Sequence, residues 1–252
     1  MKNENLKEKY DQVFSAGSEK FFSVNYFNEA HTIVGMGEWQ NKAVLDVGCG
    51  EGVLCSMAAH AGASRVVGID YSSEAIANAN KKFNMDNLEF YAGDHKEINE
   101  KFDVITMEGV MEHFDSPWDE LKDMLDNRLN ENGYLITSSP SFLNPRGYVW
   151  MTLLKLFDVP MSLTDIHYIC PFDMKNFCEE NGYNLEYKSI YQDWGSGSGM
   201  IGDFNKRLRN ALRDANMDNS KVDDLLEWLS QAKDFFKPDN DSGAVVVYKI
   251  TK

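Results

Sequence analysis

The sequence predicts an α/β fold, in which buried strands alternate with helices. An apolar run over residues 43–47, rich in β-branched side chains, indicates a buried strand. Apolar residues then recur at helical spacing from Val53 to Ala61, and a second β-branched run ends at Asp70. Between the first strand and the helix stand three glycines at alternate positions, Gly48, Gly50 and Gly52. Strand, glycine turn, helix, strand and acid in this order are typical of a βαβ unit that binds a nucleotide.

Each part of this unit has a physical role. Glycines permit backbone angles that a Cβ would forbid, and they let a ligand lie directly against the main chain. Asp70 lies 20 residues beyond Gly50, so the second strand carries its carboxylate to the edge of the sheet beside the glycine turn. There it can accept both hydroxyls of a ribose. A dinucleotide fingerprint is incomplete, because its third small residue would be Val53, and no lysine follows the glycines as a phosphate-binding loop requires.

The remaining elements follow in order along the chain. A helix over 72–85 is capped by Ser72 or Ser73, and a later helix begins after Ser116 and ends at Gly133. Further strands are expected over 88–94, 102–109, 134–140, 184–192 and 243–250, which makes seven in all. Helical segments are expected over 171–183 and 203–236. The glycine- and serine-rich run 195–199 is typical of a flexible linker.

Three stretches resemble the motifs of class I S-adenosylmethionine-dependent methyltransferases. Asp46 followed by G-C-G-E-G at 48–52 resembles their first motif, and I-D-Y-S at 69–72 resembles their second. The run 102–117 resembles the fourth motif of the small-molecule branch, with Glu108, Glu112 and His113 in an E-x-x-E-H-type pattern. The resemblance implies a Rossmann-like seven-stranded sheet flanked by helices, with S-adenosylmethionine as the cofactor.

The resemblance also implies which residues hold that cofactor. In the family, the acid of the first motif lies near the methionine ammonium, which is Asp46 here, and the second acid, here Asp70, holds the ribose. Asp94 matches the position that accepts a hydrogen bond from the adenine amino group, and the segment around Glu108 lines the methionine end. The complete set of expected cofactor-binding residues is Asp46, Gly48, Cys49, Gly50, Asp70, Tyr71, Asp94, His95 and Glu108.

The domain organisation is expected to be a single methyltransferase domain over 1–252, since 252 residues suffice for one large α/β domain with insertions. Residues 1–40 form an N-terminal helical cover, in which Tyr10, Phe14 and Phe22 are candidates for a lid over the cofactor. Two apolar inserts, 141–170 and 200–240, are interpreted as a cap over the active site. Packing between two protomers, and hence a homodimer, is the alternative interpretation of these inserts.

Composition and charge exclude several classes of partner. The formal net charge of −15 argues against DNA or RNA as the main partner. The four cysteines have no metal-binding spacing and indicate reduced thiols of a cytoplasmic protein. The N-terminal stretch lacks an apolar segment, and no run of 18 apolar residues occurs, so we expect neither secretion nor membrane spanning.

The catalytic candidates follow from the chemistry of methyl transfer. The reaction is an in-line displacement at a sulfonium, so the enzyme mainly aligns the acceptor and excludes water. A hydroxyl acceptor also needs a base, and histidine suits neutral pH. Of the five histidines, His31 and His60 are expected at the surface or in packing, and His95 near the adenine. His113 and His167 are therefore the candidate bases. Ubiquinone-pathway O-methyltransferases share the Glu-His element and use a divalent metal, but no complete metal site is evident here, so none is predicted.

Three hypotheses about function remain open at this stage. The first is an enzyme that methylates a small polar acceptor at oxygen, such as a sugar, a sugar nucleotide or a biosynthetic intermediate. The second is an N-methyltransferase, in which Glu112 or Asp165 orients a small amine. The third is a non-catalytic binding subunit with a methyltransferase fold. The intact set of acids and glycines argues against the third, because an inactive site has no physical need for them.

Overall fold

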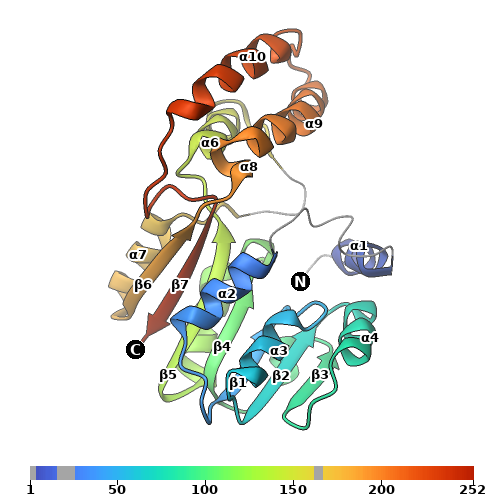
Figure 1. The fold of residues 1–252 in the computed structure, drawn as a ribbon, viewed down its shortest axis with the longest axis vertical. Coiled ribbons are helices and arrows are strands. Elements are labelled where there is room, and N and C mark those ends of the chain that lie inside the picture. Colours follow the sequence, from blue (N-terminus) through green and yellow to red (C-terminus); the bar gives the residue numbers. More distant parts are fainter. Residues whose placement is uncertain (1–3, 16–25, 162–166) are drawn as a thin grey trace. The chain divides into compact units, whose positions relative to one another are not determined.

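The computed structural model describes residues 4–15, 26–161 and 167–252 (Figure 1). Its centre is a seven-stranded sheet with the order β3-β2-β1-β4-β5-β7-β6. The strands are β1 (Ala43–Val47), β2 (Arg65–Asp70), β3 (Leu88–Ala92), β4 (Phe102–Glu108), β5 (Leu129–Pro140), β6 (Asn184–Ile190) and β7 (Val245–Thr251). The predicted fold class and number of strands are therefore confirmed.

The first five strands are parallel, and their register aligns the ends that carry the predicted site. β1 lies between β2 and β4, with Val47 opposite Ile69 and Asp46 opposite Thr106. β3 adds to β2, and β5 adds to β4. In Figure 1 the arrow of β7 runs opposite to that of β5, so the sheet is mixed. Because parallel strands present their carboxyl ends on one edge, residues that follow β1, β2 and β4 come together there.

Helices precede, separate and follow these strands along the chain. They are α1 (Glu4–Ser15), α2 (Tyr26–Met36), α3 (Val53–His60), α4 (Ser73–Lys82), α5 (Pro117–Asp123), α6 (Pro145–Phe157), α7 (Pro171–Asn181), α8 (Asp193–Ser196), α9 (Ser198–Asp214) and α10 (Val222–Ala232), with short helices η2 (His95–Glu97), η3 (Met111–His113), η4 (Met124–Arg128) and η5 (Lys233–Phe235). α3 packs on β1 and β2, α4 on β2 and β3, and α2 on α3. Within the described residues, the search for a helix long and apolar enough to cross a bilayer finds none.

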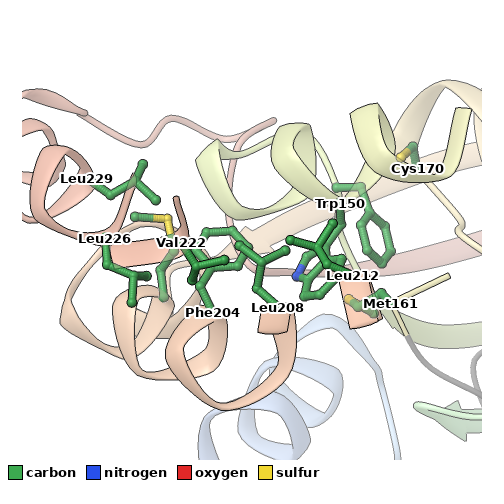
Figure 2. Close-up of a cluster of buried hydrophobic side chains, with 11 residues drawn as sticks. Trp150, Met161, Cys170, Phe204, Leu208, Leu212, Val222, Leu226 and Leu229 are labelled. Atoms are coloured by element: carbon green, nitrogen blue, oxygen red, sulfur yellow. The ribbon is translucent and has the colours of Figure 1, made fainter. Parts of the chain in front are cut away.

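The chain divides into two compact units. The first comprises residues 1–139, 175–186 and 247–252, and the second comprises 140–174 and 187–246. The second unit has an apolar core of its own, to which α6, α9 and α10 contribute (Figure 2). Its buried members are Phe142, Trp150, Met161, Cys170, Met200, Phe204, Leu208, Leu212, Val222, Leu226 and Leu229. The apolar residues of the two predicted inserts therefore pack together inside this unit.

The prediction of a flexible linker over 195–199 is wrong. Gly195 and Ser196 end α8, Gly197 lies between the two helices, and Ser198 and Gly199 begin α9. The Asp193 carboxylate accepts hydrogen bonds from the backbone N–H groups of Ser198, at 3.0 Å, and Gly199, and so satisfies donors at the start of α9. A Cβ on Gly195 would lie 2.8 Å from the Cβ of Ala244. The glycines are present because the backbone is closely packed, which composition alone does not reveal.

The boundary between the fifth helix and the fifth strand also differs from the prediction. The helical segment ends at Arg128, and β5 begins at Leu129, which pairs with Phe102. Gly133 was expected to end the helix, but it lies inside β5, where a Cβ would come within 2.8 Å of the Asp103 carbonyl oxygen. This glycine permits a close approach of two backbones.

The core of the second unit provides a test of its independent packing. Phe204 is fully buried in that core, whereas Phe235 is 86% exposed in the same unit. We expect Phe204→Ala to lower the free energy of unfolding by about 3–5 kcal/mol, because it removes a buried ring and leaves a cavity. Phe235→Ala, the matched control, should change it by less than about 0.5 kcal/mol. Urea unfolding of both variants measures the difference, and equal effects would contradict the described core.

Candidate active site

The glycine turn after β1 is held in a backbone conformation that favours glycine. Gly48, Gly50 and Gly52 have φ angles of 70°, 51° and 80°. The backbone N–H groups of Gly48 and Cys49 both donate to the Ile69 carbonyl oxygen, at 2.8 and 3.1 Å. A Cβ on Gly48 would lie 2.5 Å from a methyl group of Val110. The turn is therefore closed against the end of β2, and Val110 packs directly on its main chain at Gly48.

Asp70, at the end of β2, is bound to this turn. One carboxylate oxygen accepts the Gly50 N–H at 2.9 Å, and the other accepts the Ser72 N–H at 2.8 Å. Burial raises the pKa of Asp70, although these two hydrogen bonds act in the opposite direction. Each oxygen has a further lone pair, so the carboxylate can also accept ligand hydroxyls. The sequence predicts this residue at the ribose, and its geometry suits that role.

Asp46 lies buried at the end of β1. Its carboxylate accepts hydrogen bonds from the Thr106 hydroxyl at 2.6 Å and from the Cys55 thiol at 3.1 Å. Burial raises the pKa of Asp46 to about 6, despite these two bonds. Burial likewise raises the pKa of the neighbouring Cys49 thiol, which disfavours its thiolate form. Sequence reasoning missed Thr106, because only the register of β1 and β4 places it opposite its partner Asp46.

The residues after β3 form a compact polar group. β3 ends at Ala92, so Asp94 lies beyond the strand and caps η2 by accepting the Lys96 N–H at 2.9 Å. His95 is buried, with Nδ1 at 3.2 Å from Asp94 and Nε2 at 3.1 Å from Glu120. Burial lowers the pKa of His95 in spite of these two acids. Tyr71 bonds to Asp94, and burial together with that carboxylate raises the tyrosine pKa. Both ring nitrogens of His95 therefore lie beside acids of the protein itself.

Glu108 ends β4, and the charge of Glu29 in α2 acts on its carboxyl group. Its Oε1 atom is buried and has no hydrogen-bond partner among the described residues. Burial, together with the nearby charges of Glu29 and Asp46, raises the pKa of Glu108 well above its usual range. Sequence reasoning missed Glu29. The sequence could have indicated this residue, because Glu29 is the only acid in the otherwise largely apolar helix α2.

The two candidate bases belong to different units of the chain. His113 lies in η3 of the first unit, and its Nε2 is 3.1 Å from the Tyr10 hydroxyl of α1. His167 lies in the second unit, where its buried Nε2 has no partner among the described residues. Asp165 lies outside the described residues. The described part of the chain gathers no group of three His, Cys, Asp or Glu side chains suited to a metal ion.

Helix α1 lies against the glycine turn and α4. The Phe14 ring stands 3.6 Å from the position of a Cβ on Gly50. Asp11 accepts a hydrogen bond from the Ser72 hydroxyl at 2.6 Å, next to Asp70. Two of the predicted lid residues, Tyr10 and Phe14, therefore lie close to predicted site residues, and the third, Phe22, lies outside the described residues. Asp11 had no sequence signal, because only the fold brings it to the end of β2.

Sequence comparison relates the chain to methyltransferases. The family model described as "Methyltransferase domain" matches residues 39–192, more than half of the chain. The chain is 39% identical over 105 residues to the ribosomal protein L11 methyltransferase of Lactobacillus johnsonii, covering 40% of this chain and 32% of that protein. It is 30% identical over 172 residues to the mitochondrial ubiquinone biosynthesis O-methyltransferase of Schizosaccharomyces pombe, covering 62% of each. The chain thus spans less than two thirds of both curated relatives.

Comparison with solved structures agrees on the fold. The DhpI–SAM–HEP complex superposes with a TM-score of 0.63 at 12% identity, covering 97% of this chain and 95% of that one. The S-adenosylmethionine-dependent methyltransferase from Mesorhizobium loti gives a TM-score of 0.54 at 14% identity, covering 88% and 96%. At these identities the likeness establishes the architecture alone.

The position of Asp70 leads to a binding test. We expect S-adenosylhomocysteine to bind one site per chain, and NAD not to bind. Asp70→Ala should weaken S-adenosylhomocysteine binding by about 1–3 kcal/mol, because it removes a charged acceptor of ribose hydroxyls. Calorimetry measures both, with the exposed Asp86→Ala as the matched control. Unchanged affinity in Asp70→Ala would remove the ribose assignment.

Proposed function

Because the chain belongs to the methyltransferase-domain family and its cofactor is S-adenosylmethionine, we propose that it transfers a methyl group to a small polar acceptor, at a hydroxyl oxygen. The observation that carries this proposal is the closed glycine turn, in which Asp70 accepts the Gly50 N–H and keeps lone pairs for a ribose. A sugar, a sugar nucleotide or a biosynthetic intermediate would fit this acceptor class.

The chain's own residues divide the work of such a reaction. The bound cofactor supplies a methyl group on a sulfonium, which is already a good leaving group. Asp70 would hold the ribose hydroxyls, Asp94 the adenine amino group, and Asp46 the methionine ammonium. The backbone of Gly48 and Gly50 would lie against the amino-acid part, with Cys49, Tyr71, His95 and Glu108 completing the proposed contacts. Positioning of this kind is the main source of rate enhancement when the leaving group is already activated.

Methylation at oxygen requires a group that accepts the proton of the hydroxyl. His113 suits this role, because the Tyr10 hydroxyl fixes its ring at 3.1 Å and it follows β4 beside Glu112. His167 suits it for another reason, since its buried Nε2 has no partner in the described part of the chain. The similarity to an enzyme named for ubiquinone biosynthesis O-methylation supports oxygen as the acceptor atom.

We assign the choice of acceptor to the second unit. The cofactor motifs lie in the first unit, whereas the predicted cap inserts 141–170 and 200–240 lie within the second. A separate apolar core gives that unit the rigidity that a selective pocket needs. The single-domain organisation with an N-terminal cover over 1–40, the cap and the homodimer all stay predictions.

A second candidate function is methylation at nitrogen. Glu112 is a buried acid after β4, and a carboxylate can orient an amine whose lone pair attacks directly. The similarity to an enzyme named for ribosomal protein L11 also raises a protein acceptor, but it covers only 40% of this chain.

A non-catalytic binding subunit is the third alternative. Its discriminating property is cofactor binding without turnover.

The experiment that tests the proposed function is incubation of the protein with methyl-labelled S-adenosylmethionine and a panel of acceptors. The panel contains hydroxyl compounds, their amine counterparts and ribosomal protein L11. Label on a hydroxyl compound supports the proposal, and label confined to amines or to the protein contradicts it.

The histidines provide a sharper prediction once an acceptor is found. We expect His113→Ala or His167→Ala to lower turnover by about 10²–10⁴-fold, the usual contribution of acid–base catalysis, with little change in S-adenosylhomocysteine affinity. The exposed His60→Ala is the control. Turnover measured at saturating cofactor distinguishes the variants. Full activity in both single variants would indicate an amine acceptor or a purely positional mechanism.

A further inference from the structure

Two thiols, those of Cys49 and Cys55, converge beside β2, and none of the proposed steps uses them as a pair. Cys49 lies between Gly48 and Gly50 in the glycine turn, and Cys55 lies in the first turn of α3. A Cβ built on Gly68 of β2 would lie 2.9 Å from the sulfur of each cysteine. Two atoms at that distance from one point lie at most twice that distance apart. The glycine turn, α3 and β2 therefore bring both sulfurs to one place.

The pair has apolar as well as acidic neighbours. The Phe90 ring would lie 2.8 Å from the same Cβ position on Gly68, so an aromatic side chain packs beside the two sulfurs. The Cys55 thiol is fully buried and donates to the Asp46 carboxylate at 3.1 Å, whereas Cys49 is partly exposed. Cys49 is therefore the side from which an ion can reach the pair, and Cys55 is its buried end.

The charges around the pair disfavour a bare thiolate but favour a bound cation. Burial raises the pKa of both thiols, and the charge of Asp46 raises each of them further. Asp70 acts on the pKa of Cys49 in the same direction. The same negative charges attract a positive ion that reaches the sulfurs. A cation bound to both sulfurs would offset the charge of the thiolates and of the nearby acids.

We propose that Cys49 and Cys55 are a binding site for Cu⁺, which is held by the two sulfurs. Soft thiolate sulfur is a ligand that selects Cu⁺, and this ion accepts two such ligands in a linear arrangement. A metal–thiolate bond is about 2.3 Å long, the value for zinc. A linear unit with two such bonds spans less than the upper limit on the separation of the two sulfurs. The site does not depend on which acceptor is methylated.

Binding exchanges protons for the ion. Each sulfur forms one bond to Cu⁺ and releases its proton to solvent, so one cation enters the site, two protons leave it and no electron is transferred. The Cys55 thiol then no longer donates to Asp46. Occupation of the site therefore changes the surroundings of the acid that is predicted to lie at the methionine ammonium.

Competition for Cu⁺ with a chromogenic chelator tests this proposal on the full chain. The protein is reduced and kept free of oxygen, and the absorbance of the Cu⁺–chelator complex measures the ion that the protein withdraws. We expect one Cu⁺ per chain. Cys55→Ser keeps a hydroxyl donor for Asp46 but lacks the soft ligand. It should weaken Cu⁺ binding by more than about 100-fold, the upper end of the range for loss of an outer-shell partner.

Cys178→Ser is the matched control, because it removes another buried thiol, in α7. This variant should withdraw as much Cu⁺ as the wild type. If the wild type withdraws no Cu⁺, the proposal is wrong. Cys55→Ser with wild-type affinity also overturns it, and so does an equal loss of affinity in Cys178→Ser, because the ion would then bind to other thiols.

X-ray absorption at the copper edge provides a measurement that needs no variant to fold. In the Cu⁺-loaded wild type we expect two sulfur ligands at one distance from the metal. A third sulfur, or nitrogen or oxygen atoms bound to the metal, would contradict a site made of these two thiols.

Discussion

The hydrogen bond from the Gly50 N–H to the Asp70 carboxylate is the constraint on which the site depends. It joins the turn after β1 to the end of β2, and the two N–H groups that donate to Ile69 close the same junction from the backbone. The left-handed conformation of three glycines makes this closure sterically accessible. Because β1 is central among the parallel strands, the position of the turn is fixed on both sides, by β2 and by β4. The acids of the site owe their spacing to this register.

The second unit is stabilised in a different way. A buried ion pair between Arg146 of α6 and Asp203 of α9, at 2.8 Å, joins two helices that also share the apolar core. The guanidinium also lies over the Trp194 ring, 4.9 Å from its centroid. Breaking such a buried pair leaves an uncompensated charge, so it favours one relative arrangement of the helices. The unit is thus a specified structure, and its helices are more than a long connection between strands.

The sequence predicted what depends on local signals. The glycine turn, Asp46 and Asp70 are encoded within one βαβ unit, so their spacing along the chain determines their positions in space. Glu29 and Asp11 could not be found this way, because the fold alone brings α1 and α2 to the strand ends. The prediction of a flexible linker over 195–199 failed for a related reason. The sequence does not distinguish a glycine required by close packing from a glycine in a flexible linker. His167 belongs to the second unit, for which no motif gave a register, so its role stays a prediction.

The buried acids also affect the stability of the ligand-free protein. Folding raises the pKa of Asp46 to about 6. The free energy of unfolding therefore falls as the pH rises from the pKa of this carboxyl in the unfolded chain to its pKa in the folded chain. At neutral pH this destabilisation is fully present in the ligand-free chain. A ligand that binds only the folded state adds about 2.7 kcal/mol at a hundred times its Kd. Cellular proteases degrade the unfolded fraction, so the abundance of this protein should follow the supply of its cofactor.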